Sequence, residues 1–326
     1  MTHLRSLALA ALLSGTALSA AADPVTLRYL PNHGGLAAFE LADELGYYKE
    51  AGITLENLGY ATGGPETLIA LAGGSADIGS AATPAVLNSI AGGNDFVAVF
   101  PTNGINDQSQ SIFYVLNDSP IKTIADLPGH TIAVNTLGAH LDYVVREALH
   151  QKGLPEDAAN LIVVPGPQLE QVLRAGQVDV SAFGYWQTTF EGAARKTGGI
   201  RAVFDDTDVL GDIAGGFAVL RRDWIDAHPK ETRAFVDGAT KALDYARTHP
   251  EETKAIFARV LEERGENPEV AQYFAGYGVR EGGLATERDV QFWIDILTRE
   301  GKIAPGKIAA KDILYQSAEA PAPTTN

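Results

Sequence analysis

The chain has 326 residues, of which 41 are acidic and 25 are basic, and its formal net charge is −16 at pH 7. This acidic balance argues against nucleic acid as a partner, because phosphates are repelled by a negatively charged surface. The sequence contains no cysteine, which excludes disulfides, thiolate metal sites, cysteine nucleophiles and acylated-cysteine anchors. A chain of this length is expected to form two domains rather than one.

The first 22 residues have the three-part pattern of a secretory signal peptide. A start that contains Arg5 is followed by an apolar run over 7–18 and by small residues over 19–22. We expect cleavage near Ala22 and export of the mature chain to the periplasm. No later stretch has the roughly 18 uninterrupted apolar residues of a membrane helix, so no direct membrane insertion is expected.

Strands and helices alternate through the first two hundred residues. In the first half the sequence predicts strands at 25–30, 53–60 and 95–100, with helices at 37–46 and 84–91. In the second half it predicts strands at 130–135 and 161–165, with helices at 141–152 and 188–196. Alternation of this kind predicts α/β sheets of the parallel type.

An internal repeat divides this region into two similar parts. Residues 64–81, GPETLIALAGGSADIGSA, align without gaps with residues 166–183, GPQLEQVLRAGQVDVSAF. In each copy a proline suits the first turn of a helix, a later glycine suits a left-handed helix stop, and a short buried strand follows. Asp77 and Asp179 precede these strands and are expected to bind backbone amides rather than a ligand. The repeat predicts two doubly wound lobes.

Two further segments, 111–121 and 215–225, are predicted to cross between the lobes. Each has an aromatic residue, an apolar pair and an Asp-bearing turn, although two unconnected edge strands would give the same pattern. The chain would then leave the first lobe near Val115 and return near Phe217. The predicted division is a signal peptide at 1–22, a discontinuous lobe I at 23–114 and 218–315, lobe II at 115–217, and a tail at 316–326.

The sequence after Asp226 predicts mainly helices, since apolar residues recur every three or four positions with charged residues between them. These C-terminal helices are expected to pack on the first lobe. The tail at 316–326 has no apolar face and is expected to be disordered.

Four motifs taken together resemble one protein family. They are ADELGYYKEAGITLE, LAGGSADIGSA, SPIKTIADLPGHTIAVNTLGAH and DWIDAHPKETRAFV. The chain resembles the periplasmic substrate-binding components of ABC importers for nitrate, aliphatic sulfonates and taurine, which are related to binders of thiamine pyrimidine precursors. The resemblance implies an α/β clamshell with the ligand between its lobes. It also implies a membrane permease and a separate ATPase subunit as partners.

The loops after the predicted strands are the candidate ligand cleft, because ligands bind beyond the carboxyl ends of strands in open α/β sheets. Several of these loops are rich in Gly, Thr and Asn before a helix, where exposed N–H groups can bind an anionic or polar group. The candidate ligand-binding residues are Asn32, His33, Gly34, Thr62, Gly63, Thr83, Asn135, Thr136, Gly138, His140, Tyr185 and Trp186.

For several candidates a purely structural role is an open alternative: helix capping for Thr62 and Thr136, capping or a solvent-facing position for His33 and His140, and packing for Tyr185 and Trp186. Contact at Asn135 and Gly138 is what the resemblance implies, because the family places a polar loop there.

None of the loops that hold these candidate residues contains Lys or Arg, so nitrate would lack a bidentate partner. We therefore expect a small organic ligand, such as taurine, another sulfonate or another small organic acid, captured by closure of the lobes. The alternative ligand is a thiamine-precursor-like or other aromatic heterocycle stacked on Tyr185 and Trp186.

Catalysis is not expected. The HExxH, GxxxxGK[ST], GxSxG and GxGxxG signatures are all absent, and the seven histidines lack metal-ligand spacing, so no catalytic residue, cofactor or metal is predicted. Two enzymes of the same architecture, thiamine pyrimidine synthase and porphobilinogen deaminase, depend on cysteine, which this chain lacks. A ligand-sensing protein that docks on a receptor is a further alternative.

Overall fold

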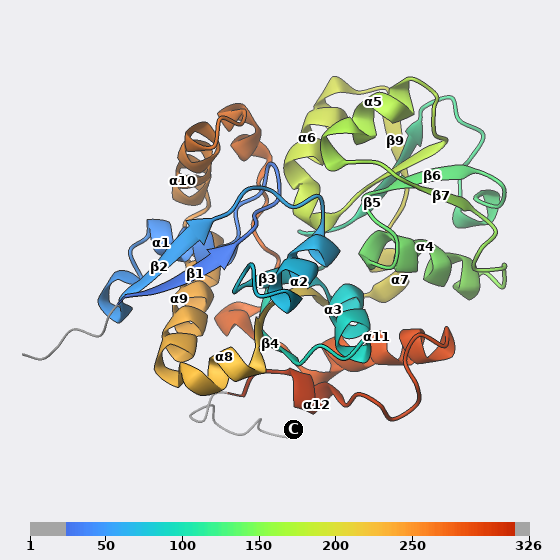
Figure 1. Ribbon diagram of the computed structural model, residues 1–326. Coiled ribbons are helices and arrows are strands. Elements are labelled where there is room, and N and C mark those ends of the chain that lie inside the picture. The colour runs from blue at the N-terminus through green and yellow to red at the C-terminus, as the bar shows by residue number, and fades with distance from the viewer. Residues whose placement is uncertain (1–23, 317–326) are drawn as a thin grey trace, which may run out of the picture.

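The computed structural model describes residues 24–316, so the predicted signal peptide and residues 317–326 of the predicted tail lie outside the described residues. The chain forms two α/β lobes (Figure 1). This confirms the two-lobed fold predicted from the repeat.

The first lobe contains both ends of the described chain. Its strands are β1 (Val25–Tyr29), β2 (Ile53–Asn57), β3 (Gly79–Ala82), β4 (Phe96–Ile105) and β10 (Ile213–Arg221). Its helices are α1 (Ala38–Glu44), α2 (Gly64–Ala72), α3 (Thr83–Ala91), α8 (Arg222–Ala227), α9 (Pro229–Thr248), α10 (Pro250–Glu263), α11 (Glu287–Arg299) and α12 (Ala310–Ile313).

The second lobe is a single continuous stretch of chain. Its strands are β5 (Ile112–Leu116), β6 (Thr131–Val134), β7 (Asn160–Val163), β8 (Val180–Phe183) and β9 (Ile200–Asp205). Its helices are α4 (His140–Gln151), α5 (Leu169–Arg174) and α6 (Thr188–Thr197). The short helix α7 (Thr207–Leu210) lies in the segment that returns to the first lobe and packs against α4 and β9.

Among the described strands, β1 and β2 form a parallel sheet, the three-stranded sheet is antiparallel and the five-stranded sheet is mixed, so the predicted parallel type is wrong for the two larger sheets. The order is β1-β2 and β3-β10-β4 in the first lobe, and β7-β6-β8-β5-β9 in the second. β10 runs antiparallel to both β3 and β4, and β5 runs antiparallel to both β8 and β9. The physical reason is that β5 and β10 each enter their lobe from the other one. Each therefore inserts in the reverse direction between two strands of that lobe.

The two repeat copies occupy equivalent places in the two lobes. The backbone N–H of Asp77 donates to Arg28 O at 2.8 Å, and that of Asp179 donates to Thr131 O at 3.0 Å. In return, the carboxylates of these aspartates accept the backbone N–H of Arg28 at 3.0 Å and of Thr131 at 2.8 Å. Both aspartates thus bind backbone amides, although those amides belong to a neighbouring strand rather than to the turn.

The crossings between the lobes lie at 106–111 and 206–212, before the two strands that were predicted to cross. β5 lies wholly in the five-stranded sheet, and β10 lies wholly in the first lobe. The backbone N–H of Asp206 donates to Ser111 O at 3.0 Å, so the two crossings are hydrogen-bonded to each other. β5 and β10 are buried core strands. Their apolar pattern therefore identified the strand that follows each crossing rather than the crossing itself.

The C-terminal helices cover the first lobe, as predicted. α9 packs against α1 and β4, and α11 packs against α3 and β10. The Arg299 side chain of α11 also reaches α4 of the second lobe, where it forms an ion pair of 2.5 Å with Glu147. The C-terminal region therefore contacts both lobes.

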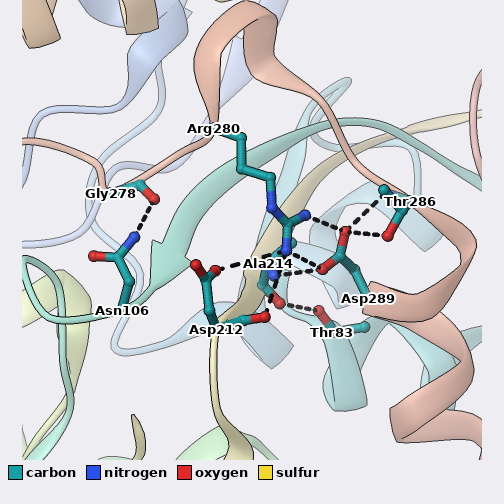
Figure 2. A network of polar contacts seen from close by, with 8 residues as sticks. All are labelled: Thr83, Asn106, Asp212, Ala214, Gly278, Arg280, Thr286 and Asp289. Carbon is teal, nitrogen blue, oxygen red and sulfur yellow. Dashed lines mark hydrogen bonds and ion pairs between the residues drawn. The ribbon is translucent and has the colours of Figure 1, made fainter. Parts of the chain in front are cut away.

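A polar network joins this C-terminal region to both crossings (Figure 2). Arg280 contacts the buried carboxylate of Asp289 at 2.7 and 3.1 Å, and the N–H of Ala214 donates to the same carboxylate at 3.0 Å. Arg280 also lies 3.6 Å from Asp212 in the second crossing. Asn106 in the first crossing donates to Gly278 O at 2.7 Å. The network stabilises the region about which the lobes meet.

Asp289 should make this network sensitive to pH. Burial by itself raises the pKa of this carboxyl, but the hydrogen bonds from Arg280, Thr286 and Ala214 outweigh that effect and lower it. Its stabilising contribution is then complete above the unfolded pKa of about 4 and is lost as the pH falls toward the lower folded pKa.

We predict that Asp289→Asn lowers the free energy of unfolding by about 2 kcal/mol at pH 7, because it removes charge-assisted hydrogen bonds. Between about pH 5 and pH 2 the stability of the variant should also fall less steeply than that of the wild type. Urea unfolding at several pH values measures both effects. The control is Asp295→Asn on the exposed face of the same helix. Equal stability of the two variants would contradict the prediction.

Candidate functional site

Two adjoining cavities lie between the lobes. The centre of a water molecule can occupy about 70 Å³ of the first cavity and about 50 Å³ of the second. Since one water takes up roughly 10–15 Å³ of such space, the cavities together have room for on the order of ten waters. The residues that line both of them are Asn32, Ser80, Thr102, Asn103, Tyr185 and Trp186. The site therefore suits a small molecule that touches both lobes.

The walls of the cavities come from the carboxyl ends of strands and from the starts of helices. α2 begins at Gly64 and α4 begins at His140, and both residues line the second cavity. The N-terminus of a helix carries unpaired N–H groups and a partial positive charge, which favour an anion. The local backbone thus provides positive potential without any basic side chain.

No Lys or Arg is among the residues that line the two cavities. The one carboxylate of the walls, Glu40, forms an ion pair with Arg264 and accepts the N–H of Ala37 at 2.7 Å. Burial raises the pKa of Glu40, and the charge of Arg264 opposes this rise. The acidic charge of the site is therefore already compensated.

Three buried polar atoms at the cavity walls have no hydrogen-bond partner within the described chain. They are Asn135 Oδ1, His140 Nδ1 and the Tyr277 hydroxyl. Burial, followed by the charge of Glu40, raises the pKa of Tyr277, so its hydroxyl keeps its proton and remains a donor. An unsatisfied buried polar group costs about 1–3 kcal/mol, so a ligand that bonds to these atoms gains affinity.

Two aromatic rings separate the cavities from the second-lobe core. Tyr185 and Trp186 meet edge to face with ring centroids 4.7 Å apart. A Cβ atom at Gly215 would lie 2.6 Å from the Tyr185 ring, so only glycine fits at that position. The pair gives the cleft an apolar wall next to its polar groups.

Of the predicted site residues, seven are brought together at the cavity walls: Asn32, Gly34, Asn135, Thr136, His140, Tyr185 and Trp186. The other five, His33, Thr62, Gly63, Thr83 and Gly138, do not line either cavity.

The five residues outside the walls have local partners. His33 stacks on Tyr60 with ring centroids 3.8 Å apart, and the Thr62 hydroxyl donates to Glu66 at 2.8 Å. The Thr83 hydroxyl points to the carbonyls of Ala214 and Gly215, at 3.5 and 3.3 Å. Gly138 forms a left-handed turn closed by Asp142, and Gly63 lies beside the Asn135 amide. For the exposed His33, and for Thr62, which pairs with a residue of α2, these contacts agree with the structural alternatives. For Gly63, Thr83 and Gly138 the ligand contact stays a prediction.

Sequence reasoning missed several wall residues. Thr102 and Asn103 line both cavities, at the end of a strand that was predicted to stop at Phe100. The rule that ligands lie beyond the carboxyl ends of strands would have found them if the strand had been extended past Pro101. Tyr277 belongs to an irregular segment without periodicity, and no sequence signal pointed to it.

The lobes touch around the cleft. The Thr189 hydroxyl of α6 donates to Gly34 O of the first lobe at 2.9 Å, and Asn88 of α3 donates to Gly138 O of the second lobe at 3.2 Å. A Cβ atom at Gly34 would lie 2.9 Å from the Phe190 ring, which shows how closely the two surfaces approach. The structure is therefore a closed arrangement of the lobes.

We predict that Thr189→Val weakens ligand binding about fivefold, because it removes a buried hydrogen bond that the closed arrangement makes across the cleft. Isothermal titration calorimetry with ethanesulfonate measures the loss. The matched control is Thr197→Val on the same helix, whose hydroxyl bonds only to Ala193 O of that helix. Equal affinities of the two variants would count against closure as the binding step.

Within residues 24–316, no group of three or more acidic or histidine side chains is arranged to hold a metal ion. Over the same range, every helix is too short or too polar to cross a membrane.

Comparison with known proteins identifies the fold. The model of the family described as NMT1/THI5 like matches residues 31–253. A putative aliphatic sulfonates-binding protein of Escherichia coli (strain K12) is 28% identical over 274 residues, which cover 80% of each chain.

Two solved structures extend the likeness over almost the whole chain. The periplasmic aliphatic sulphonate binding protein SsuA from Escherichia coli has a TM-score of 0.71 at 21% identity, covering 93% of this chain and 96% of that one. The alkanesulfonate-binding protein SsuA from Xanthomonas axonopodis pv. citri, bound to MOPS, has a TM-score of 0.73 at 19% identity, covering 91% and 100%. The clamshell fold predicted from the sequence is thus confirmed.

Proposed function

Because the chain belongs to the NMT1/THI5-like family, we propose that it is the solute-binding component of an ABC importer that captures a small organic anion by closing its lobes. The observation that carries this proposal is the pair of unpartnered buried atoms, Asn135 Oδ1 and His140 Nδ1, in a cleft formed by both lobes. Asn135 Oδ1 accepts hydrogen bonds, and so does His140 Nδ1 when the Nε2–H donates to Asp206. Both atoms are therefore satisfied by a ligand that carries a donor beside its acid group, such as the ammonium of taurine.

An aliphatic sulfonate or a related small organic acid fits the cleft best. The starts of α2 and α4 favour negative charge, and the rings of Tyr185 and Trp186 offer an apolar wall for an organic body. Relatives named as sulfonate-binding proteins support the same class. The absence of Lys and Arg from the cavity walls argues against a small inorganic anion such as nitrate.

The ligand is released unchanged to a permease that works with a separate ATPase subunit. This part of the proposal rests on relatives named as binding proteins and on a chain without cysteine or a nucleophile motif. A solved relative named as periplasmic, together with the signal-peptide pattern of residues 1–22, supports a place in the periplasm.

The binding of sulfonates is tested with the unmodified protein. Ethanesulfonate, methanesulfonate and taurine should raise the unfolding temperature by several degrees at 100 times the Kd, because ligand then adds about 2.7 kcal/mol to the stability. Acetate and nitrate serve as comparisons and should have smaller effects. Nuclear magnetic resonance of the recovered ligand should show the starting compound. A panel without any stabilising sulfonate, or a converted ligand, would overturn the proposal.

A second candidate ligand is an aromatic heterocycle, and the specific observation in its favour is that Trp186 lines both cavities beside Tyr185. If the ligand stacks on this ring, Trp186→Ala should reduce its affinity about tenfold. For an aliphatic sulfonate we expect less than a threefold change. Calorimetry compares both ligands against Trp224→Ala, a half-buried tryptophan in α8 that does not line either cavity.

A further inference from the structure

Four buried residues connect the cleft to both crossings: Ser111, His140, Tyr185 and Asp206, which we call the crossing unit. They are between 0% and 3% exposed. Ser111 ends the first crossing, and Asp206 begins the second. His140 opens α4, and Tyr185 follows β8. The unit thus gathers four segments that are distant in sequence.

Asp206 is the centre of the crossing unit. One oxygen of its carboxylate lies 2.7 Å from His140 Nε2, and the other accepts the backbone N–H of Ser111 at 2.8 Å. Its own backbone N–H donates to Ser111 O at 3.0 Å. A single residue therefore holds the two crossings together and also holds a residue of the cleft wall.

The unit returns to the cleft through Ser111. The Ser111 hydroxyl accepts the backbone N–H of Tyr185 at 3.1 Å. The rings of Tyr185 and His140 meet edge to face with centroids 5.0 Å apart, and both residues line the second cavity. The two wall residues are thus each hydrogen-bonded to a residue of a crossing.

The His140 imidazole is enclosed on several sides. Among the described residues, its ring neighbours are Tyr185, Trp186 from the same loop, and Trp293 from α11, with the Trp293 centroid 5.8 Å away. Asp206 and Tyr185 are the titratable groups among these contacts, and burial followed by the charge of Asp206 raises the pKa of Tyr185, so it stays neutral. A displacement of the imidazole is therefore transmitted to the Asp206 carboxylate.

We propose that the crossing unit couples occupancy of the cleft to the angle between the lobes, with Asp206 as the positioning residue. A donor group of the ligand, such as the ammonium of taurine, bonds to His140 Nδ1 and fixes the ring, and the ring fixes the carboxylate that joins the crossings. In the empty cleft the ring lacks this contact, so the crossings sample more angles. The coupling rests on the proposed function, which supplies the ligand. It goes beyond that function because it assigns the transmission of lobe closure to Ser111 and Asp206, which do not line either cavity.

The test uses Asp206→Asn, which keeps an oxygen for the Ser111 N–H but places an NH₂ donor against His140 Nε2, so the neutral ring must move its proton to Nδ1, where it no longer accepts from the ligand. The matched control is Asp208→Asn, an exposed acid in the same segment. Because the chain has no cysteine, Glu50→Cys in the first lobe and Gln171→Cys in the second give a single pair of sites for spin labels. Distances between the labels are measured with and without taurine, and the Kd is measured by calorimetry.

Compared with the control, the Asp206→Asn protein should bind taurine at least tenfold more weakly and show a broader label distribution both with and without the probe. A distribution equal to that of the control, with a Kd within twofold, overturns the coupling. If the wild type binds neither taurine nor any other sulfonate of the panel, the proposed function is contradicted, whereas the probe-free distributions still decide the coupling.

If Asp206→Asn does not fold, amide hydrogen exchange of the wild type decides the question. The N–H groups of Ser111 and Asp206 should exchange at least tenfold more slowly with taurine bound, while the N–H of His249, between α9 and α10, stays unchanged. Unchanged rates at Ser111 and Asp206 overturn the coupling.

Discussion

The reciprocal hydrogen bonds between Ser111 and Asp206 are the constraint on which the rest of the structure depends, because they bind together the two places where the chain passes between lobes. Each crossing delivers a strand, β5 or β10, that inserts in reverse between two strands of the lobe it enters. The cleft between the lobes forms where the carboxyl ends of their parallel strands face one another.

Much of the fold could be predicted from local pattern. The repeat at 64–81 and 166–183 has the glycine, proline and aspartate signals of one unit, and Gly74 and Gly176 do adopt the left-handed conformation that their position after a helix implies. The direction of β5 and β10 could not be predicted, because a buried apolar strand has the same pattern whichever way its neighbours run. The position of the crossings decides it, because they end at 111 and 212, whereas the pattern put them near Val115 and Phe217.

The site was predictable where a loop directly follows a strand, as at Asn135 and Tyr185. It was not predictable where a side chain had a closer local partner, because Thr62 and Glu66 form a capping pair that competes with any ligand. Tyr277 shows the opposite case: tertiary packing of an irregular segment brings its hydroxyl to the cavity from the C-terminal part of the chain. The polar surface of the cleft thus comes partly from loops that directly follow strands and partly from residues that only the tertiary fold brings to the cavity.

The central claim is that a small organic anion holds the two lobes together without being changed. Small-angle X-ray scattering of the unmodified protein, recorded with and without saturating ethanesulfonate, tests it most directly. We expect a smaller radius of gyration for the ligand-bound protein than for the ligand-free protein, approaching the value calculated for the closed arrangement of the lobes. Identical scattering curves at a concentration where calorimetry shows full binding would contradict it.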